Sequence, residues 1–312
     1  MRRRRFAVTL LTMDLPHGLT TRPLRPDDAR AVFDLMVDSQ TLDAGEPSVD
    51  LEDVVGDWQR PSFDLATQAI GVEDSGHLVG YADVANGRYA DVAVASTHRG
   101  RGMGTWLADW TQAEARRQGG SMVGMPVPVG SDGDHLLERL GYHVAWTSWV
   151  LQLGEGEQIE SQPLPEGYAV RPFRPGEERT AYRIVEDAFN EWPDRQPVAY
   201  DDWAARVVRR PGFEPWHLRL ATEPGGEVVG VGYIFVSGDC GYVPTLAVRG
   251  DQRGRGLARA LLVDCFEVAR EHGASRSELS TDTRTGALGL YERVGMKVTS
   301  TWVHRAIPLL SP

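Results

Sequence analysis

The sequence predicts an α/β protein of two tandem lobes, each with a mixed, mostly antiparallel twisted sheet flanked by helices. Three observations support this prediction. The length of 312 residues suits about two domains of ordinary size. An apolar strand, an Arg- and Gly-rich loop and an amphipathic helix follow one another twice. Several shorter motifs also recur in the same order in both halves, as an internal duplication would produce.

The duplication can be followed through motifs that repeat at a nearly constant offset. Arg99 in THRGRGMG and Arg253 in DQRGRGLA lie 154 positions apart. TRPLRPDD near the start of the first half matches VRPFRPGE near the start of the second, and HLVGY matches EVVGV. LLERLGY, which ends at Tyr142, matches LYERVGM, which ends at Met296. We therefore interpret the chain as two copies of one domain.

Composition and the positions of polar stretches suggest the domain boundaries. We expect an N-terminal extension at residues 1–17, a first lobe at 18–156, a polar and acidic linker at 157–165 and a second lobe at 166–312. The basic and then apolar start is interrupted by Asp14 and Pro16 and lacks a small-residue cleavage site, so we expect no export. Cys240 and Cys265 form no disulfide framework. These features predict a cytoplasmic protein.

The overall composition excludes several classes of function. The chain is 41% hydrophobic and 25% charged, as is ordinary for a protein with packed cores. Its net charge of −11 argues against nucleic acid as the main partner. No apolar run is long enough to cross a membrane, and no cluster of ligand residues predicts a metal site.

The first lobe is predicted from apolar periodicity and from turn residues. A helix after Arg25 places Ala29, Val32, Phe33 and Met36 on one face. A second helix is expected at Leu51–Trp58. A third follows the loop at 99–104 and ends before Gly119, and a fourth ends at Leu140. The strands are expected at Thr21–Leu24, Leu65–Val72, Leu78–Val84, Asp91–Ala95, Ser121–Val127 and Trp146–Leu153.

The second lobe repeats this plan. A helix that begins at the glycine loop places Leu257, Leu261, Cys265 and Val268 on one face and ends near Gly273. The other helices are expected at Glu177–Asn190, Tyr200–Arg209 and Gly286–Arg293. The strands are expected at Tyr168–Arg171, Trp216–Ala221, Val228–Val236, Tyr242–Val248, Ser277–Thr281 and Thr299–Ile307.

The loop between strand and helix is the most informative segment. Glycines there let amide N–H groups converge at a helix N-terminus, which is a favourable place for a phosphate or pyrophosphate. The loop is not a P-loop, because no Lys-Ser or Lys-Thr follows the glycines, and Arg259 stands where a dinucleotide fingerprint needs its third glycine. What remains is R-x-x-G-x-A from Arg253 to Ala258. Alone, this pattern also suits an ordinary turn before a surface helix, but it occurs twice.

This pattern resembles the pyrophosphate arm of the GNAT family of acyl-CoA-dependent N-acyltransferases, in tandem proteins such as those resembling mycothiol synthase. The resemblance implies acetyl-CoA as cosubstrate and no metal. It places the phosphate cradle at Arg253, Gly254, Arg255, Gly256, Leu257 and Ala258, and the amides that face the pantetheine and thioester at Leu246, Ala247 and Val248. The corresponding positions of the first lobe are Val92, Ala93, Val94, Arg99, Gly100, Arg101, Gly102, Met103 and Gly104.

The resemblance also predicts the proton donor. GALGLYERVGM resembles the family segment whose Tyr lies beside the sulfur of CoA, which makes Tyr291 the general acid. The alternative is an aromatic residue packed at a helix end. Leu137 stands at this position in the first lobe, so we expect the second lobe to be catalytic and the first to be structural or regulatory.

The sequence leaves the general base and the acceptor open. Ordered water alone could also remove the proton, and Trp192, Trp203 and Trp216 could line an acceptor pocket or belong to the core. The candidates for the base are Glu186, Asp187, Asp201, Asp202, Asp239 and His217.

The predicted function is acetyl transfer from acetyl-CoA to a primary amine of a small molecule by direct attack. The alternatives are acetylation of an amino-thiol sugar, as in mycothiol synthase, and an acyl-CoA-binding sensor without turnover. We expect a monomer in which the two lobes form an intramolecular pseudo-dimer, or a homodimer.

Overall fold

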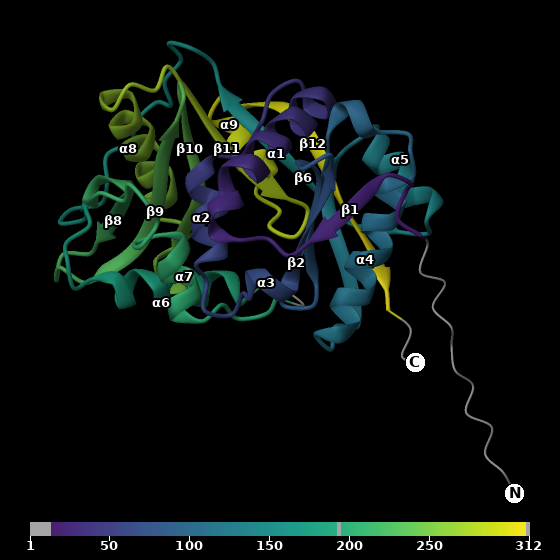
Figure 1. The fold of residues 1–312 in the computed structure, drawn as a ribbon. Coiled ribbons are helices and arrows are strands. Elements are labelled where there is room, and N and C mark those ends of the chain that lie inside the picture. The colour runs from purple at the N-terminus through teal and green to yellow at the C-terminus, as the bar shows by residue number, and fades with distance from the viewer. Residues whose placement is uncertain (1–13, 192–194, 310–312) are drawn as a thin grey trace, which may run out of the picture. The chain divides into compact units, whose positions relative to one another are not determined.

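The structure is a computed structural model that describes residues 14–191 and 195–309. Its contacts divide the chain into two compact units. Within the described residues, the first unit contains residues 14–54, 62–145 and 303–309, and the second contains residues 55–61 and 146–302. Of the predicted N-terminal extension, residues 1–13 lie outside the described part. The predicted α/β class with mixed sheets and flanking helices is confirmed (Figure 1).

The first unit begins with strand β1 and helix α1, and α2 is divided between the units. The bounds are β1 (Leu19–Arg22), α1 (Ala29–Ala44), α2 (Leu51–Trp58), α3 (Leu65–Gln68), β2 (Ala69–Asp74), β3 (His77–Ala85), β4 (Tyr89–Val94), α4 (Met103–Arg117), β5 (Met122–Pro128) and α5 (Asp132–Arg139). Strands β1 to β4 are paired antiparallel, and β4 pairs with β5 in parallel. Helix α4 packs Met103 and Leu107 against Val72 and Ala82 of the sheet.

From β7 onward the chain repeats this order. The remaining elements are β6 (His143–Leu153), β7 (Ala169–Pro172), α6 (Glu178–Phe189), α7 (Tyr200–Arg206), β8 (Leu218–Thr222), β9 (Val228–Ser237), β10 (Cys240–Val248), α8 (Leu257–Glu271), β11 (Arg276–Asp282), α9 (Leu288–Arg293) and β12 (Lys297–Pro308). Strands β7 to β10 are paired antiparallel, β10 and β11 are parallel, and β11 pairs antiparallel with β6.

Two apolar layers cover the sheet of the second unit. On one face, α8 buries Leu261, Cys265 and Phe266 against Ile234 and other sheet residues. On the other face, α6 and α7 pack against Val231, Tyr233, Phe235 and Ala247. Strand β9 is buried along most of its length because it contributes to both layers. The strand is accordingly apolar without alternation, as expected for a strand covered on both faces.

The last strand of each repeat joins the sheet of the other unit. Residues 146–153 of β6 belong to the second unit, where Leu151 and Leu153 are in the core. Residues 303–308 of β12 belong to the first unit, where β12 is the neighbour of β5. The Leu309 amide donates to the Ser121 carbonyl there, at 2.7 Å. Each compact unit is therefore built from both halves of the chain.

One predicted strand begins later than expected. Leu65–Gln68 forms a helical turn, α3, and β2 starts only at Ala69. The Asp64 side chain accepts a hydrogen bond from the Ala66 amide and so caps this turn. N-terminal capping by Asp stabilises the first turn of a helix against the extended conformation.

Among residues 14–191 and 195–309, no helix is both long and apolar enough to span a membrane.

Candidate active site

The site of the second unit begins where two parallel strands diverge. Pairing between β10 and β11 runs from Cys240 with Arg276 to Val243 with Leu279. Beyond that point β10 continues to Val248 and β11 to Asp282. Pro244 lies at the irregularity in the pairing of β10 with β9 and has no N–H to donate. An opening between the two strands results, with backbone groups along its β10 side.

The pairing pattern shows which amides of β10 face this opening. The Arg249 amide donates to the Val229 carbonyl of the neighbouring strand, at 2.9 Å. Successive residues of an antiparallel strand alternate in direction, so the Ala247 amide also points toward β9. The amides of Leu246 and Val248 consequently point away from β9, toward the opening.

The glycine loop follows directly. Gly254 and Gly256 have φ values of +77° and +81°, which favour glycine over residues with a Cβ. Gly256 is the N-cap of α8, and no side chain caps the helix there. The first-turn amides can therefore donate to an anion. A Cβ at either glycine would meet no atom within 4 Å, so the space in front of the loop is open.

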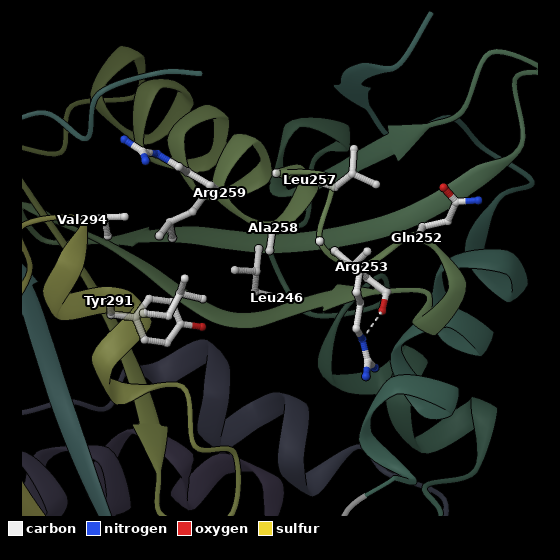
Figure 2. Close-up of a pocket in the computed structure, with 13 residues that line it drawn as sticks. Leu246, Gln252, Arg253, Leu257, Ala258, Arg259, Tyr291 and Val294 are labelled. Carbon is white, nitrogen blue, oxygen red and sulfur yellow. Dashed lines mark hydrogen bonds between the residues drawn. The ribbon is translucent and has the colours of Figure 1, made fainter. Parts of the chain in front are cut away.

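Strand, loop and α9 line one pocket. Tyr291 lies across this pocket from the loop, and its hydroxyl points from α9 toward Leu246 (Figure 2). The lining residues are Leu246, Val248, Gln252, Arg253, Gly254, Gly256, Leu257, Ala258, Arg259, Leu262, Leu290, Tyr291 and Val294. The structure thus brings most of the predicted second-lobe residues together.

Tyr291 is half-buried and packs against the core under α8. Burial disfavours the phenolate and raises the pKa of this side chain above its ordinary value. The group therefore holds its proton at neutral pH, as a proton donor to a leaving thiolate must.

Two predicted residues lie away from the pocket. Ala247 is buried in the layer under α6 and α7, on the opposite face of the sheet. Arg255 is exposed, and its guanidinium carbon lies 6.0 Å from the centre of the Tyr168 ring. The pocket lining does not include either side chain.

The basic side chains beside the pocket have partners of their own. The Arg253 guanidinium pairs with Glu191 at 2.6 and 3.0 Å and donates to the Val248 carbonyl at 3.3 Å (Figure 2). Arg259 donates to the Glu160 carbonyl. Arg253 therefore ties the start of the loop to the segment after α6.

Sequence reasoning missed part of the lining, namely Gln252, Arg259, Leu262, Leu290 and Val294. Helical spacing contained a signal for some of them. Leu290 and Val294 flank Tyr291 along α9 and the turn that follows, and Leu262 lies four residues after Ala258. A search for residues three or four positions from the predicted ones would have found Leu262 and Val294.

The first unit contains the equivalent loop in a different setting. Strands β4 and β5 pair only through Tyr89 and Gly124. The Arg99 guanidinium holds Asp43 at 2.6 and 2.8 Å and contacts the Ser39 hydroxyl at 2.9 Å. Gly100 and Gly102 have φ values of +73° and +87°. The loop conformation and the pairing of its first Arg therefore recur.

A Cβ on Gly100 would meet no atom within 4 Å, but the first turn of α4 after this loop is closely packed. A Cβ on Gly104 would lie 2.9 Å from Leu136 Cδ2, and one on Gly102 would lie 3.9 Å from Pro16 Cγ. Met103 and Ala93 are buried, and Val92 and Val94 pack against the core. Arg101 is exposed. Leu137, at the position that corresponds to Tyr291, is a buried core residue and has no hydroxyl.

Most candidates for the general base have other partners. Buried Glu186 accepts from Arg195 and from the Val198 amide. Asp201 pairs with Arg209, and Asp239 pairs with Arg276. The Glu214 amide donates to His217 Nδ1, and burial lowers the pKa of this His.

The remaining candidates are placed by burial. Asp187 is exposed, and Asp202 is buried on α7. Trp203 is in the core, and Trp216 is stacked between His217 and His272 at centroid distances of 3.8 and 3.9 Å. Trp192 lies outside the described residues. In the described part of the chain, no three His, Cys, Asp or Glu residues form a group that could bind a metal ion.

Comparisons with known proteins give the family. The profile of the acetyltransferase (GNAT) family matches residues 30–142 and 179–296. A mycothiol acetyltransferase of Salinispora arenicola is 32% identical over 270 residues, which is 80% of this chain and 82% of the relative.

Solved structures agree with this assignment. A GCN5-related N-acetyltransferase from Sphaerobacter thermophilus has a TM-score of 0.74 and 31% identity, and the match covers 96% of this chain and 98% of that one. A tandem GNAT protein from the clavulanic acid biosynthesis pathway has a TM-score of 0.71 at 17% identity, with 94% and 99% covered, and so shares the fold. The chain therefore belongs to the acetyltransferase (GNAT) family, as an acyl-CoA-dependent N-acetyltransferase with two GNAT repeats.

Proposed function

We propose that the second lobe transfers an acetyl group from acetyl-CoA to a primary amine of a small molecule, by direct attack. One observation carries this proposal. A single pocket joins the glycine loop at the start of α8, the open side of β10 and the hydroxyl of Tyr291. These are the parts that aminolysis of a thioester requires.

The donor would lie along the pocket in a fixed direction. The amides at the start of α8 would hold the pyrophosphate, in the open space that a Cβ at Gly256 would enter. The opening beside β10 would admit the extended pantetheine, and Leu246 and Leu262 would contact its apolar parts. The thioester would then lie between β10 and Tyr291.

The chemistry follows from this orientation. The amides of Leu246 and Val248 face the opening and would stabilise the oxyanion that develops on the thioester carbonyl, an effect typically worth a few kcal/mol. As the C–N bond forms and the C–S bond breaks, Tyr291 would donate its proton to the departing sulfur. The raised pKa keeps this phenol protonated until that step.

We assign the first lobe a structural or regulatory role. Leu136 packs closely against Gly104 in the first turn of α4, and Leu137 stands where the second lobe has its proton donor. We keep the predicted boundaries of the lobes, residues 18–156 and 166–312, as part of this proposal.

The acceptor has a second candidate. Mycothiol acetyltransferases of several organisms are similar to most of the chain, and the relative from Saccharomonospora viridis matches 90% of it at 28% identity. This similarity favours an amino-thiol sugar as the acceptor.

A panel of primary amines tests the proposal. Glucosamine, cysteine methyl ester and an amino-thiol sugar are incubated with acetyl-CoA, and acetylated products are identified by mass spectrometry, because thiol acceptors would obscure a free-thiol assay. We expect the parent to acetylate one of these amines, and Tyr291→Phe to acetylate the same amine much more slowly. Binding of acetyl-CoA without turnover on any amine would instead support a sensor.

A further inference from the structure

A pair of hydroxyl groups lies where β10 and β11 begin to diverge, on the face of the sheet opposite to the donor pocket. Tyr242 Oη donates to Ser280 Oγ at 2.9 Å. Tyr242 packs against the layer under α6 and α7, and its ring centre is 5.6 Å from that of Phe235 in the same layer. Ser280 is exposed and follows Leu279, which is buried on the α8 side. Side chains alternate along a strand, so Ser280 faces the Tyr242 side.

The direction of attack makes this face important. In the proposed function, on which this inference rests, the sulfur and Tyr291 lie on the α8 side of the opening. An amine must approach the thioester carbonyl from outside its plane and away from the departing sulfur, at roughly 3–3.5 Å. The donor and Tyr291 occupy the α8 side, so the amine has to arrive from the side of Tyr242 and Ser280.

We infer that Tyr242 and Ser280 bind the acceptor's primary amine and pass its proton to water. A hydroxyl that donates one hydrogen bond can still accept another, so Tyr242 Oη can accept from the amine N–H while it donates to Ser280. Ser280 is exposed and can donate in turn to solvent. The chain thus connects the attacking nitrogen with bulk water.

The proton and bond changes balance. The amine nitrogen forms a bond to the acetyl carbon, and the carbon–sulfur bond breaks. The proton lost by nitrogen moves through Tyr242 and Ser280 to water. Tyr291 protonates the sulfur and regains a proton from water, so the products are an acetamide and free CoA thiol.

The charged groups around the pair are already engaged. Asp282, the next β11 residue on this face, is held by the Arg284 guanidinium. Glu278, opposite Tyr242 on β11, pairs with Arg276 at 2.8 Å. On the helical side, Glu186 of α6 pairs with Arg195, and the Arg210 guanidinium lies 4.6 Å from the centre of the Phe235 ring. Neutral hydroxyls beside paired charges favour a neutral amine over an ammonium.

The first repeat has only one of the two hydroxyl groups. Tyr89 takes the place of Tyr242 in the strand pairing, because it pairs with Gly124 as Tyr242 pairs with Glu278. Pro126, two residues after Gly124, corresponds to Ser280 and has no hydroxyl, so the hydroxyl pair is incomplete in the first repeat.

Steady-state kinetics of Tyr242→Phe and Ser280→Ala test the inference, with glycinamide, ethanolamine and hydroxylamine as probe amines. Each variant should lose about tenfold in kcat/KM for the amine, as expected for one lost hydrogen bond to the reacting group. The Kd of acetyl-CoA in calorimetry should not change. Tyr182→Phe is the matched control, because its hydroxyl donates to the Val198 carbonyl elsewhere in the unit.

The pH profile provides a second readout. If no carboxylate removes the proton, the acid limb of kcat/KM should move with the pKa of each amine. An acid limb at one pH for all three amines, or unchanged kcat/KM in both hydroxyl variants, would overturn the inference while leaving the proposed function in place. A parent protein that binds acetyl-CoA and acetylates no amine would overturn both.

Discussion

At the scale of single residues, the predicted site depends on two positions whose chemistry differs in kind. Gly256 contributes a backbone conformation and the absence of a side chain, whereas Tyr291 contributes one exchangeable proton. Substitutions at the two positions should therefore affect different steps. Binding should respond to the first and turnover to the second.

Gly256→Val should weaken binding of acetyl-CoA by more than tenfold, because its side chain would enter the space in front of the loop. The left-handed φ also makes any L-residue unfavourable there, by about 1–2 kcal/mol. Gly102→Val is the matched control, since its φ is similarly positive. Calorimetry should show the loss of affinity for Gly256→Val alone. Equal affinity in Gly256→Val and the parent would place the donor elsewhere.

Tyr291→Phe should lower kcat by about 10²–10⁴, the usual contribution of general acid catalysis. The Kd of acetyl-CoA should hardly change, because the ring remains. Since burial raises the pKa of Tyr291, its ionisation should limit kcat only above a pH of about 10. The alkaline limb should be absent from the variant. Unchanged kcat on an amine that the parent acetylates would falsify the role.

At the scale of elements, the C-terminal half of β12 is attached to the first unit by a buried ion pair. Arg305 Nε lies 2.5 Å from Asp134 Oδ1 of α5, and both side chains are at most 10% exposed. Arg305 also donates to the Tyr142 carbonyl, at 3.2 Å. This pair connects the last strand of the chain to the helix that precedes β6.

Arg305→Met should reduce the free energy of unfolding by about 3–5 kcal/mol, because it leaves the Asp134 carboxylate buried without its partner. Urea denaturation measures the loss. Arg30→Met removes two exposed contacts on α1, the pair with Asp34 and the guanidinium over the Phe33 ring, and should cost less than about 1 kcal/mol. Similar losses in both variants would show that the buried pair does not fasten β12.

The same pair has a pH dependence with a defined sign. Burial alone would raise the pKa of Asp134, but the Gly130 amide and Arg305 outweigh it, and the pKa is lowered. A lowered folded-state pKa stabilises the protein above the unfolded value of 3.8, and this stabilisation is lost as the pH falls below it. The parent should therefore lose more stability than Arg305→Met between pH 5 and about pH 3.

At the scale of the whole molecule, the exchange of last strands makes each unit depend on both halves of the chain. Residues 146–153 complete the second unit, and residues 303–309 complete the first. Cutting the chain between the repeats does not remove either strand from its sheet.

A protease site placed at residues 157–160 tests this dependence. After cleavage, the two fragments should co-elute in size-exclusion chromatography without denaturant and should retain acetyl-CoA binding. If residues 303–312 are deleted before cleavage, the fragments should separate at a lower urea concentration than the fragments of the full-length chain. Fragments that separate in buffer would contradict the exchange of strands.

Much of the fold was accessible to sequence reasoning because the deciding forces are local. Helix α8 was predictable from its apolar face and from Gly256 and Gly273, and the structure places it at Leu257–Glu271. The start of β2 was predicted wrongly, because apolar residues at Leu65–Val72 suit either a strand or a capped turn. The hydrogen bond from the Ala66 amide to the Asp64 side chain stabilises the capped turn instead of the strand.

The candidate site was predictable only in part. Arg253–Ala258 and Tyr291 were found by motif, and the pocket brings them together although they are far apart in the chain. The prediction that these residues bind acetyl-CoA and protonate the thiolate stays a prediction. Tyr242 and Ser280 were not found, since neither belongs to a motif and their contact exists only because β10 lies beside β11.

The sequence by itself determined that the chain is a duplicated α/β protein of the GNAT family and that both loops need glycine. These properties rest on periodicity, motif spacing and backbone conformation, which act between residues close in the chain. Only the tertiary structure decided which sheet β6 and the end of β12 join, and which amides of β10 face the opening. The physical reason is that strands pair through backbone N–H and C=O groups, which are the same in every residue type but proline. Two similar sheets therefore offer equivalent partners to a strand, and no local sequence pattern distinguishes between them.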